Sequence, residues 1–148
     1  MKYSRSIILS LSMALFLVGK SSCKKKEVTE APVNNFFQLE KVEVDGSLIN
    51  SALTRDVSRQ PKITLTFSAP IDKSKAVSSI ILGENTLNRA DLNFTYLKSD
   101  SVLIISPAQP LKGLTKYQFN VATSLTAANG ATLNSFFDFN FHTVLDST

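Results

Sequence analysis

The stretch FFDFNFHT, residues 136–143, carries the pattern that decides the fold. Phenylalanine occupies every second position, at 137, 139 and 141, and polar side chains lie between. Successive side chains of a β-strand point to opposite faces of a sheet. The stretch therefore predicts a strand with a phenylalanine face toward a core and a polar face toward solvent.

The same two-residue period recurs along the chain after Asn35. It is clear in KITLTF (62–67), DLNFTY (91–96) and KYQFNV (116–121). Less regular apolar runs predict three more strands, at 37–44, 76–82 and 100–106. No sustained helical stripe is present, and residues 47–60 are expected to form a long connection. About seven short strands separated by turns favour an all-β sandwich of antiparallel strands.

The composition is consistent with such a sandwich. The chain has 148 residues, ten Phe, no Trp and one Cys. One cysteine cannot form an internal disulfide, so packing alone must hold the core. Each buried Phe contributes about 1.5–3 kcal/mol, and the phenylalanines are expected to fill the space between the sheets.

Three stretches of the sequence resemble a known domain family in more than their two-residue alternation. They are ITLTFSAPID (63–72), ISPAQPLKGLTKYQFNV (105–121) and TAANGATLNSFFDFNFHT (126–143). In this order they resemble the SbsA-type bacterial Ig-like domain, and the resemblance implies an Ig-like sandwich over residues 36–148. Within the second motif, Leu111 and Tyr117 resemble a tyrosine corner. There a tyrosine packs its ring inward and its hydroxyl bonds to backbone upstream.

The N-terminus has the organisation of a secretion signal. A thirteen-residue apolar run, 7–19, follows Lys2 and Arg5. It is short for a spanning helix, which needs about 20 apolar residues, and fits a signal peptide. Ser-Ser-Cys follows, which resembles a Bacteroidota-type lipoprotein signal, although Lys20 stands where such signals usually have an apolar residue. We expect residues 1–22 to be removed and Cys23 to be acylated.

The residues after Cys23 are expected to be a flexible tether, 24–35. Lys24, Lys25 and Lys26 stand where surface-exported lipoproteins of this type carry acidic residues. The sequence therefore favours a lipid anchor in the outer membrane with the domain facing the periplasm, and surface exposure stays open. An ordinary signal peptide cut elsewhere and an uncleaved helix are the alternatives.

The charge distribution argues against nucleic acid as a partner. The formal net charge is +4, but six of the sixteen basic residues precede residue 27. From Phe36 to Thr148 ten basic and ten acidic side chains give 10 − 10 = 0. A neutral body has no long-range attraction for a polyanion.

Residues for catalysis are few. His142 is the only histidine. Asp138 shares its strand face but lies four residues away, about 13 Å along a strand, which is too far to share a metal or a proton. No nucleophile elbow or phosphate loop is present. We therefore expect no catalytic residue, no metal and no cofactor. The alternative of a small envelope enzyme requires a pocket around His142.

The fold itself suggests a non-enzymatic interaction or structural module of the cell envelope. Loops carry function on such scaffolds, and the candidates are 68–78, 83–91 and 124–135. The partner is expected to be another envelope protein or a glycan.

Two further patterns concern sugars. A glycan-binding surface lipoprotein is the alternative function, and it would use an exposed phenylalanine among Phe36, Phe37 and Phe136. In addition, Asp-Ser-Val at 100–102 and Asp-Ser-Thr at 146–148 resemble O-glycosylation acceptors of Bacteroidota. Ser101 and Ser147 are therefore candidate glycosylation sites.

Overall fold

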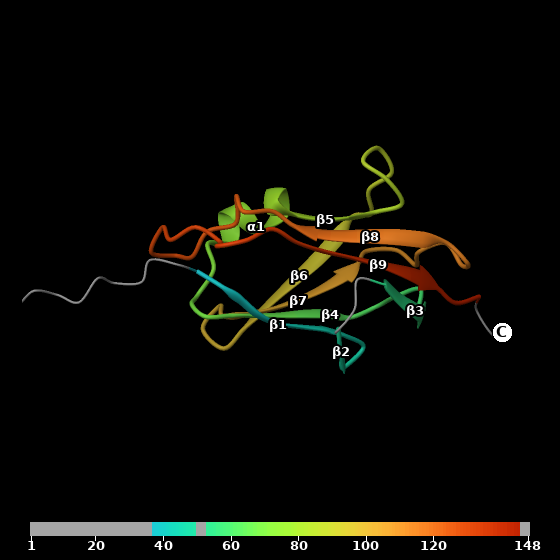
Figure 1. Cartoon of the computed structure of the whole chain (residues 1–148), viewed down its shortest axis with the longest axis horizontal. Coiled ribbons are helices and arrows are strands. Elements are labelled where there is room, and N and C mark those ends of the chain that lie inside the picture. Colours follow the sequence, from blue (N-terminus) through green and yellow to red (C-terminus); the bar gives the residue numbers. More distant parts are fainter. Residues whose placement is uncertain (1–36, 50–52, 146–148) are drawn as a thin grey trace, which may run out of the picture. The chain divides into compact units, whose positions relative to one another are not determined.

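Two β-sheets lie face to face in the computed structural model, which describes residues 37–49 and 53–145 (Figure 1). The first sheet has the order β2 (Ser47–Leu48), β1 (Leu39–Val44), β4 (Ile63–Phe67), β7 (Val102–Pro107) and β6 (Leu92–Leu97). The second has the order β3 (Leu53–Val57), β9 (Phe137–Thr143), β8 (Lys116–Val121) and β5 (Ile80–Gly83). A short helix, α1 (Lys73–Ser79), precedes β5. The predicted all-β sandwich is confirmed.

The core lies between the sheets and follows the alternation of the sequence. On β9, Phe139 and Phe141 are 1% and 0% exposed, and Phe137 is half-buried. The ring of Phe119 on β8 lies 5.3 Å from that of Phe139, and Tyr117 stacks on Phe141 at 5.7 Å. β4 places its own three apolar side chains in the same core. The phenylalanine stripe of 136–143 thus forms the centre of the second sheet's inner face.

The segment 47–60 is more structured than the sequence indicates. It was expected to be a connection, but it contains β2 and β3. β2 forms a hairpin with β1 through Asp45 and Gly46, which both have positive φ, 50° and 81°. β3 pairs in parallel with β9. The count of about seven antiparallel strands was therefore wrong: the described residues form nine strands with one parallel pair.

The predicted strand at 76–82 was also wrong in its first half. Residues up to Ser79 belong to α1, and the strand β5 begins at Ile80. The carboxylate of Asp72 caps the helix, because its Oδ1 accepts hydrogen bonds from the Ser74 N–H at 2.9 Å and the Ser74 hydroxyl at 2.7 Å. Ala76 and Ser79 face inward from a helix of seven residues. So short a helix leaves no sustained stripe in the sequence.

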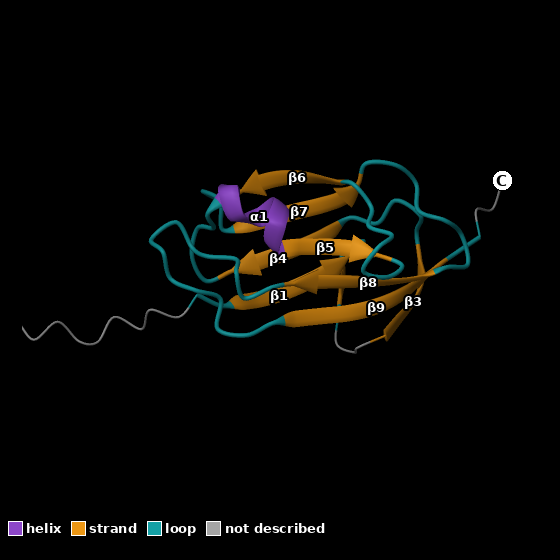
Figure 2. Cartoon of the chain, turned by 90° about the horizontal axis from the view of Figure 1, so that it is seen from above, coloured by secondary structure: helices purple, strands orange, loops and turns teal. Residues whose placement is uncertain are grey.

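The loops gather at the two ends of the sandwich (Figure 2). Segments 68–78 and 124–135 meet at one end, where the Asp72 N–H donates to Thr126 O at 2.8 Å. The loop 83–91 lies at the opposite end, beside 108–115. Two of the three predicted loops are therefore neighbours, and the third faces the other way.

Candidate binding groove

A groove of about 440 Å³ opens at the end of the sandwich that carries the loop 83–91. Residues 84–91 form one wall, and residues 109–112 form the other, with Tyr117 between them. A volume of this size falls within the range of small-ligand and peptide sites, about 300–1,000 Å³. We call it the end groove.

The first wall is a tight loop that its own residues close. At Gly83 an added Cβ would lie 2.5 Å from the Asn88 carbonyl oxygen, so only glycine fits. The Asn85 Oδ1 accepts hydrogen bonds from the N–H groups of Leu87 and Asn88, both at 2.9 Å. The Glu84 N–H donates to Asn88 O at 3.0 Å. The loop therefore presents Leu87, 90% exposed, at a fixed tip.

The second wall is held from beneath by Tyr117 and Thr143. The Tyr117 side chain is 4% exposed, and its hydroxyl accepts a hydrogen bond from the Lys112 N–H at 3.0 Å. The Thr143 hydroxyl donates to Lys112 O at 2.6 Å. Leu111 is 4% exposed, and its N–H donates to Arg59 O at 2.8 Å. The sequence predicted a tyrosine corner at Leu111 and Tyr117. In the structure both side chains are buried, and the Tyr117 hydroxyl bonds to the backbone five residues upstream.

An ion pair joins the two walls. The Lys112 Nζ lies 2.7 Å from Glu84 Oε1, and this hydrogen bond raises the pKa of Lys112. Arg89 and Asp91 add one cation and one anion to the lining, and the Arg89 Nε donates to Thr86 O at 3.2 Å. The two walls of the end groove are therefore joined by an ion pair, and the lining carries both signs of charge, with Leu87 and Leu111 adding apolar surface.

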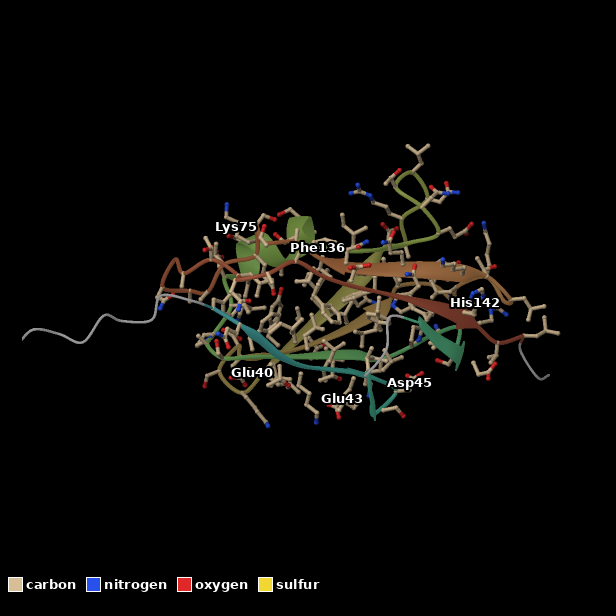
Figure 3. All side chains as sticks on the ribbon, in the orientation of Figure 1. Glu40, Glu43, Asp45, Lys75, Phe136 and His142 are labelled. Carbon is tan, nitrogen blue, oxygen red and sulfur yellow. The ribbon has the colours of Figure 1, made fainter. Side chains whose placement is uncertain are left out.

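The residues considered for catalysis lie away from the end groove's lining. His142 stands opposite Lys116 in the β8–β9 register, and Asp138 stands opposite Asn120. Within residues 37–49 and 53–145 no three His, Cys, Asp or Glu side chains gather in a way that could hold a metal ion. Figure 3 shows His142 and Phe136 at opposite ends of β9.

The three phenylalanines named as sugar platforms have different positions. Phe37 is 1% exposed and stacks on Phe67 at 5.0 Å, so it belongs to the core and is not an exposed platform. Phe136 is 55% exposed. Phe36 lies outside the described residues. Simple alternation could not distinguish Phe37 from Phe136, because each stands next to a second phenylalanine.

The predicted modification sites are only partly within the described chain. Ser101 is half-buried in the turn just before β7, and its hydroxyl donates to Lys98 O at 2.8 Å. Ser147, Cys23 and the tether 24–35 lie outside the described residues. The helix of the described part is too short and too polar to cross a membrane.

The sequence matches a family model described as bacterial Ig-like domain over residues 42–143. The chain belongs to the bacterial Ig-like domain family. Domains of this family are structural or interaction modules. The resemblance seen in the three motifs is therefore confirmed as to the domain, and the lipoprotein part of it stays a prediction. No curated protein matches the chain.

Solved structures agree on the fold. The native α-2-macroglobulin of Escherichia coli is 15% identical with a TM-score of 0.51, over 75% of this chain and 6% of that one. The MG0-NIE-MG1 part of the same protein is 14% identical with a TM-score of 0.51, over 75% and 33%. The S-layer protein SbsC is 14% identical with a TM-score of 0.45, over 72% and 13%. The two matches with a TM-score of 0.51 show the fold alone at such identities, and this chain spans a small part of each of the three chains.

Proposed function

We propose that the protein is a non-enzymatic, lipid-anchored envelope protein whose Ig-like domain binds another envelope protein through the end groove. The anchor would be diacylglycerol on Cys23, and acyl chains contribute about 0.8 kcal/mol per buried CH₂. Lys24, Lys25 and Lys26 would then lie at the headgroups of an outer membrane, with the domain in the periplasm.

The observation that carries this proposal is the position of the groove relative to Phe37. Phe37, the first described residue, lies at the end of the sandwich that carries α1 and the loop 124–135 (Figure 1). The end groove opens at the other end. A domain held at Phe37 therefore leaves the groove free to meet a partner.

The lining of the groove indicates the chemistry of the partner. It offers the Glu84–Lys112 pair, Arg89, Asp91 and the exposed tip Leu87. A protein segment with a central apolar side chain and both signs of charge would match it. The one aromatic residue in the lining, Tyr117, is buried, so a sugar ring finds no platform there. The lining includes no Ser, Cys or His to act as a nucleophile or base, which supports a binding role.

The anchor is tested by metabolic labelling. Labelled palmitate should enter the wild-type chain and be absent from Cys23→Ala. Protease added to intact cells should spare the protein, and opening the outer membrane should expose it. Equal incorporation of palmitate into both chains would end the lipoprotein proposal.

The groove is tested separately, by photo-crosslinking in cells. A photo-reactive amino acid at Leu87 should crosslink one discrete envelope protein. The matched control is the same group at Val77, which is 69% exposed on α1 at the opposite end. Glu84→Lys should then abolish the Leu87 crosslink. A crosslink obtained only at Val77, or one that survives Glu84→Lys unchanged, would contradict the proposal.

A glycan is the second candidate partner, and the exposure of Phe136 favours it. The side chain is 55% exposed, and Figure 3 shows Phe136 beside α1. Retardation in a polysaccharide affinity gel that Phe136→Ala removes and Leu87→Ala leaves intact would support this function. Equal migration of the wild type and Phe136→Ala would exclude Phe136 as the platform.

A further inference from the structure

Among the strands of the described residues, β6 forms one edge of the first sheet and has β7 as its only neighbour (Figure 2). It is six residues long, contains no proline or charged residue, and pairs with β7 without a bulge. Edge strands are usually protected by proline, lysine, a bulge or a covering segment, because their free backbone groups otherwise pair with another strand.

The register identifies which backbone groups face outward. In an antiparallel pair, residues alternate between those that exchange hydrogen bonds with the neighbour and those that point away from it. The Ala108 N–H donates to Asp91 O at 2.8 Å, and Asn93 stands opposite Ser106 on the same ladder. The odd-numbered residues therefore bond to β7. Leu92, Phe94 and Tyr96 turn their N–H and C=O groups toward the open edge.

Another edge strand of the sandwich, β5, is covered by its own chain. On β5, Ile80 donates its outward N–H to Ala76 O, and Leu82 O accepts from Ala90 N at 2.8 Å. In the first sheet β1 is not an edge, because β2 pairs with it, and Val42 O also accepts from the Ile49 N–H at 3.0 Å. Within the described part of the chain the outward groups of β6 have no such partner.

We propose that β6 pairs with β6 of a second copy of this chain, antiparallel, about a two-fold axis at Phe94. In that register Phe94 stands opposite its own copy, and Leu92 stands opposite Tyr96 of the second chain. Each such pair exchanges two backbone hydrogen bonds, so the three pairs form about six. A two-fold axis makes the same edge complementary to itself and closes the assembly as a dimer.

The charges that flank β6 select this antiparallel arrangement. Arg89 and Asp91 precede the strand, and Lys98 and Asp100 follow it. The two-fold axis sets the start of one strand against the end of the other. Asp91 then stands opposite Leu97, next to Lys98, and Arg89 stands opposite Ser99, next to Asp100, which also pairs with Lys73 at 3.0 Å. Parallel pairing would set like charges together. The net charge of zero from Phe36 to Thr148 adds no repulsion between copies.

The first test removes one outward N–H without changing the ladder to β7. Leu92→Pro lacks the N–H that points to the second copy, and proline is tolerated at such edge positions. Leu92→Ala loses the same side chain and keeps the N–H, so it is the matched control. The full chain is studied by sedimentation equilibrium in density-matched detergent. We expect the dimer of Leu92→Pro to be weaker than that of Leu92→Ala by at least about tenfold.

The second test exchanges the flanking charges. Asp91→Lys sets two cations together at each end of the dimer and should weaken it by about fivefold or more. The double variant Asp91→Lys with Lys98→Asp restores opposite charges and should recover wild-type affinity. Recovery would support the antiparallel pairing, because that pairing sets position 91 of one copy next to position 98 of the other.

Three results would overturn the proposal. One is a wild-type chain that stays monomeric up to about 1 mM. If the amides of Leu92, Phe94 and Tyr96 are protected from exchange in that monomer, another part of the same chain covers the edge. The second is a dimer of equal affinity in Leu92→Pro and Leu92→Ala. The third is a charge exchange that fails to restore association.

Discussion

The edge strands β5 and β6 lie on the same side of the sandwich, yet the chain treats them differently. A groove of about 290 Å³ separates them, with Val77, Ile81 and Phe94 in its lining. The chain on both sides of β5 takes up two of its outward backbone groups: the Ile80 N–H bonds to Ala76 O in α1, and Leu82 O accepts from the Ala90 N–H. β6 is followed by a tight turn at 98–100, where all three residues have positive φ. Among the described residues no backbone group bonds to its outward edge, although the Lys73 Nζ of α1 lies 5.0 Å from the centre of the Tyr96 ring. The four-residue edge of β5 is thus covered by segments near it in the sequence, and the six-residue edge of β6 is the one proposed above to pair with a second copy.

The inward side chains of the two edge strands also differ, because those of β5 are more deeply buried than those of β6. On β5 the inward residues Ile80 and Leu82 are 2% and 0% exposed. On β6 Leu92, Phe94 and Tyr96 are only half-buried. The covered edge is thus also the better packed one, and the open edge keeps apolar surface that a second strand would bury.

The largest expected effect comes from comparing one residue type at both edges. Leu82→Ala should lower the free energy of unfolding by about 2–5 kcal/mol, because the side chain is fully buried and leaves a cavity. Leu92→Ala should cost only about 1 kcal/mol, since half of that side chain is already in water. Urea unfolding of both variants measures the difference. A reversed order would show that β6, not β5, is the well-packed edge.

Gly83 holds the loop that covers β5, and its substitution should have the next largest effect. Gly83→Ala places a methyl group against the Asn88 carbonyl oxygen and should cost about 1–3 kcal/mol. The amide of Ala90, bonded to Leu82 O, should then exchange faster. Gly113→Ala is the control, because its Cβ would meet Val144 O at a milder 3.2 Å. Equal losses in both variants would contradict a special role of the loop.

Amide exchange in dilute solution compares the edges without a substitution. The Ile80 N–H is bonded to Ala76 O and should exchange at least about tenfold more slowly than the Phe94 N–H, which faces solvent in a monomer. Raising the protein concentration should slow the exchange of the Phe94 amide and leave that of the Ile80 amide unchanged. Protection of Phe94 that is independent of concentration would show that the edge is covered within one chain.

The smallest effect concerns the helix that covers β5 and its dependence on pH. Hydrogen bonds from the Ser74 side chain and backbone lower the pKa of Asp72 below its ordinary 3.8. The folded state therefore favours the charged carboxylate, and this stabilisation is present above pH 3.8 and is lost as the pH falls through the lowered pKa. The difference in unfolding midpoint between wild type and Asp72→Ala should therefore shrink as the pH is lowered below 3.8. The difference between Asp72→Asn and Asp72→Ala, which do not titrate, should stay constant.

The sequence was most informative where one face of a strand is buried. The alternation in 62–67, 116–121 and 136–143 predicted β4, β8 and β9 correctly, because burial on one side selects a period of two. β3 was missed because its strand is defined by parallel pairing with β9, a distant partner, and not by a local pattern. Helix α1 was missed because its signals are a single cap, Asp72, and a buried Ala76, which occur by chance in many loops.

Half of the end groove could be predicted. The loop 83–91 was among the candidates because glycine and polar residues interrupt the apolar runs there. The opposite wall, 109–112, was missed as a partner, although Leu111 and Tyr117 were singled out for the motif that contains them. Nothing local links Glu84 to Lys112, since the contact exists only after both sheets have formed.

The way in which Phe37 is attached has a mechanical consequence. Its ring lies against Phe67, its N–H donates to Thr132 O, and its C=O accepts from the Asn134 N–H. The pairing with Leu133 between these two bonds is parallel. A pulling force on the chain before Phe37 would thus act on both hydrogen bonds and on the ring contact with Phe67 at once. The force would reach the two sheets only after these three contacts had broken.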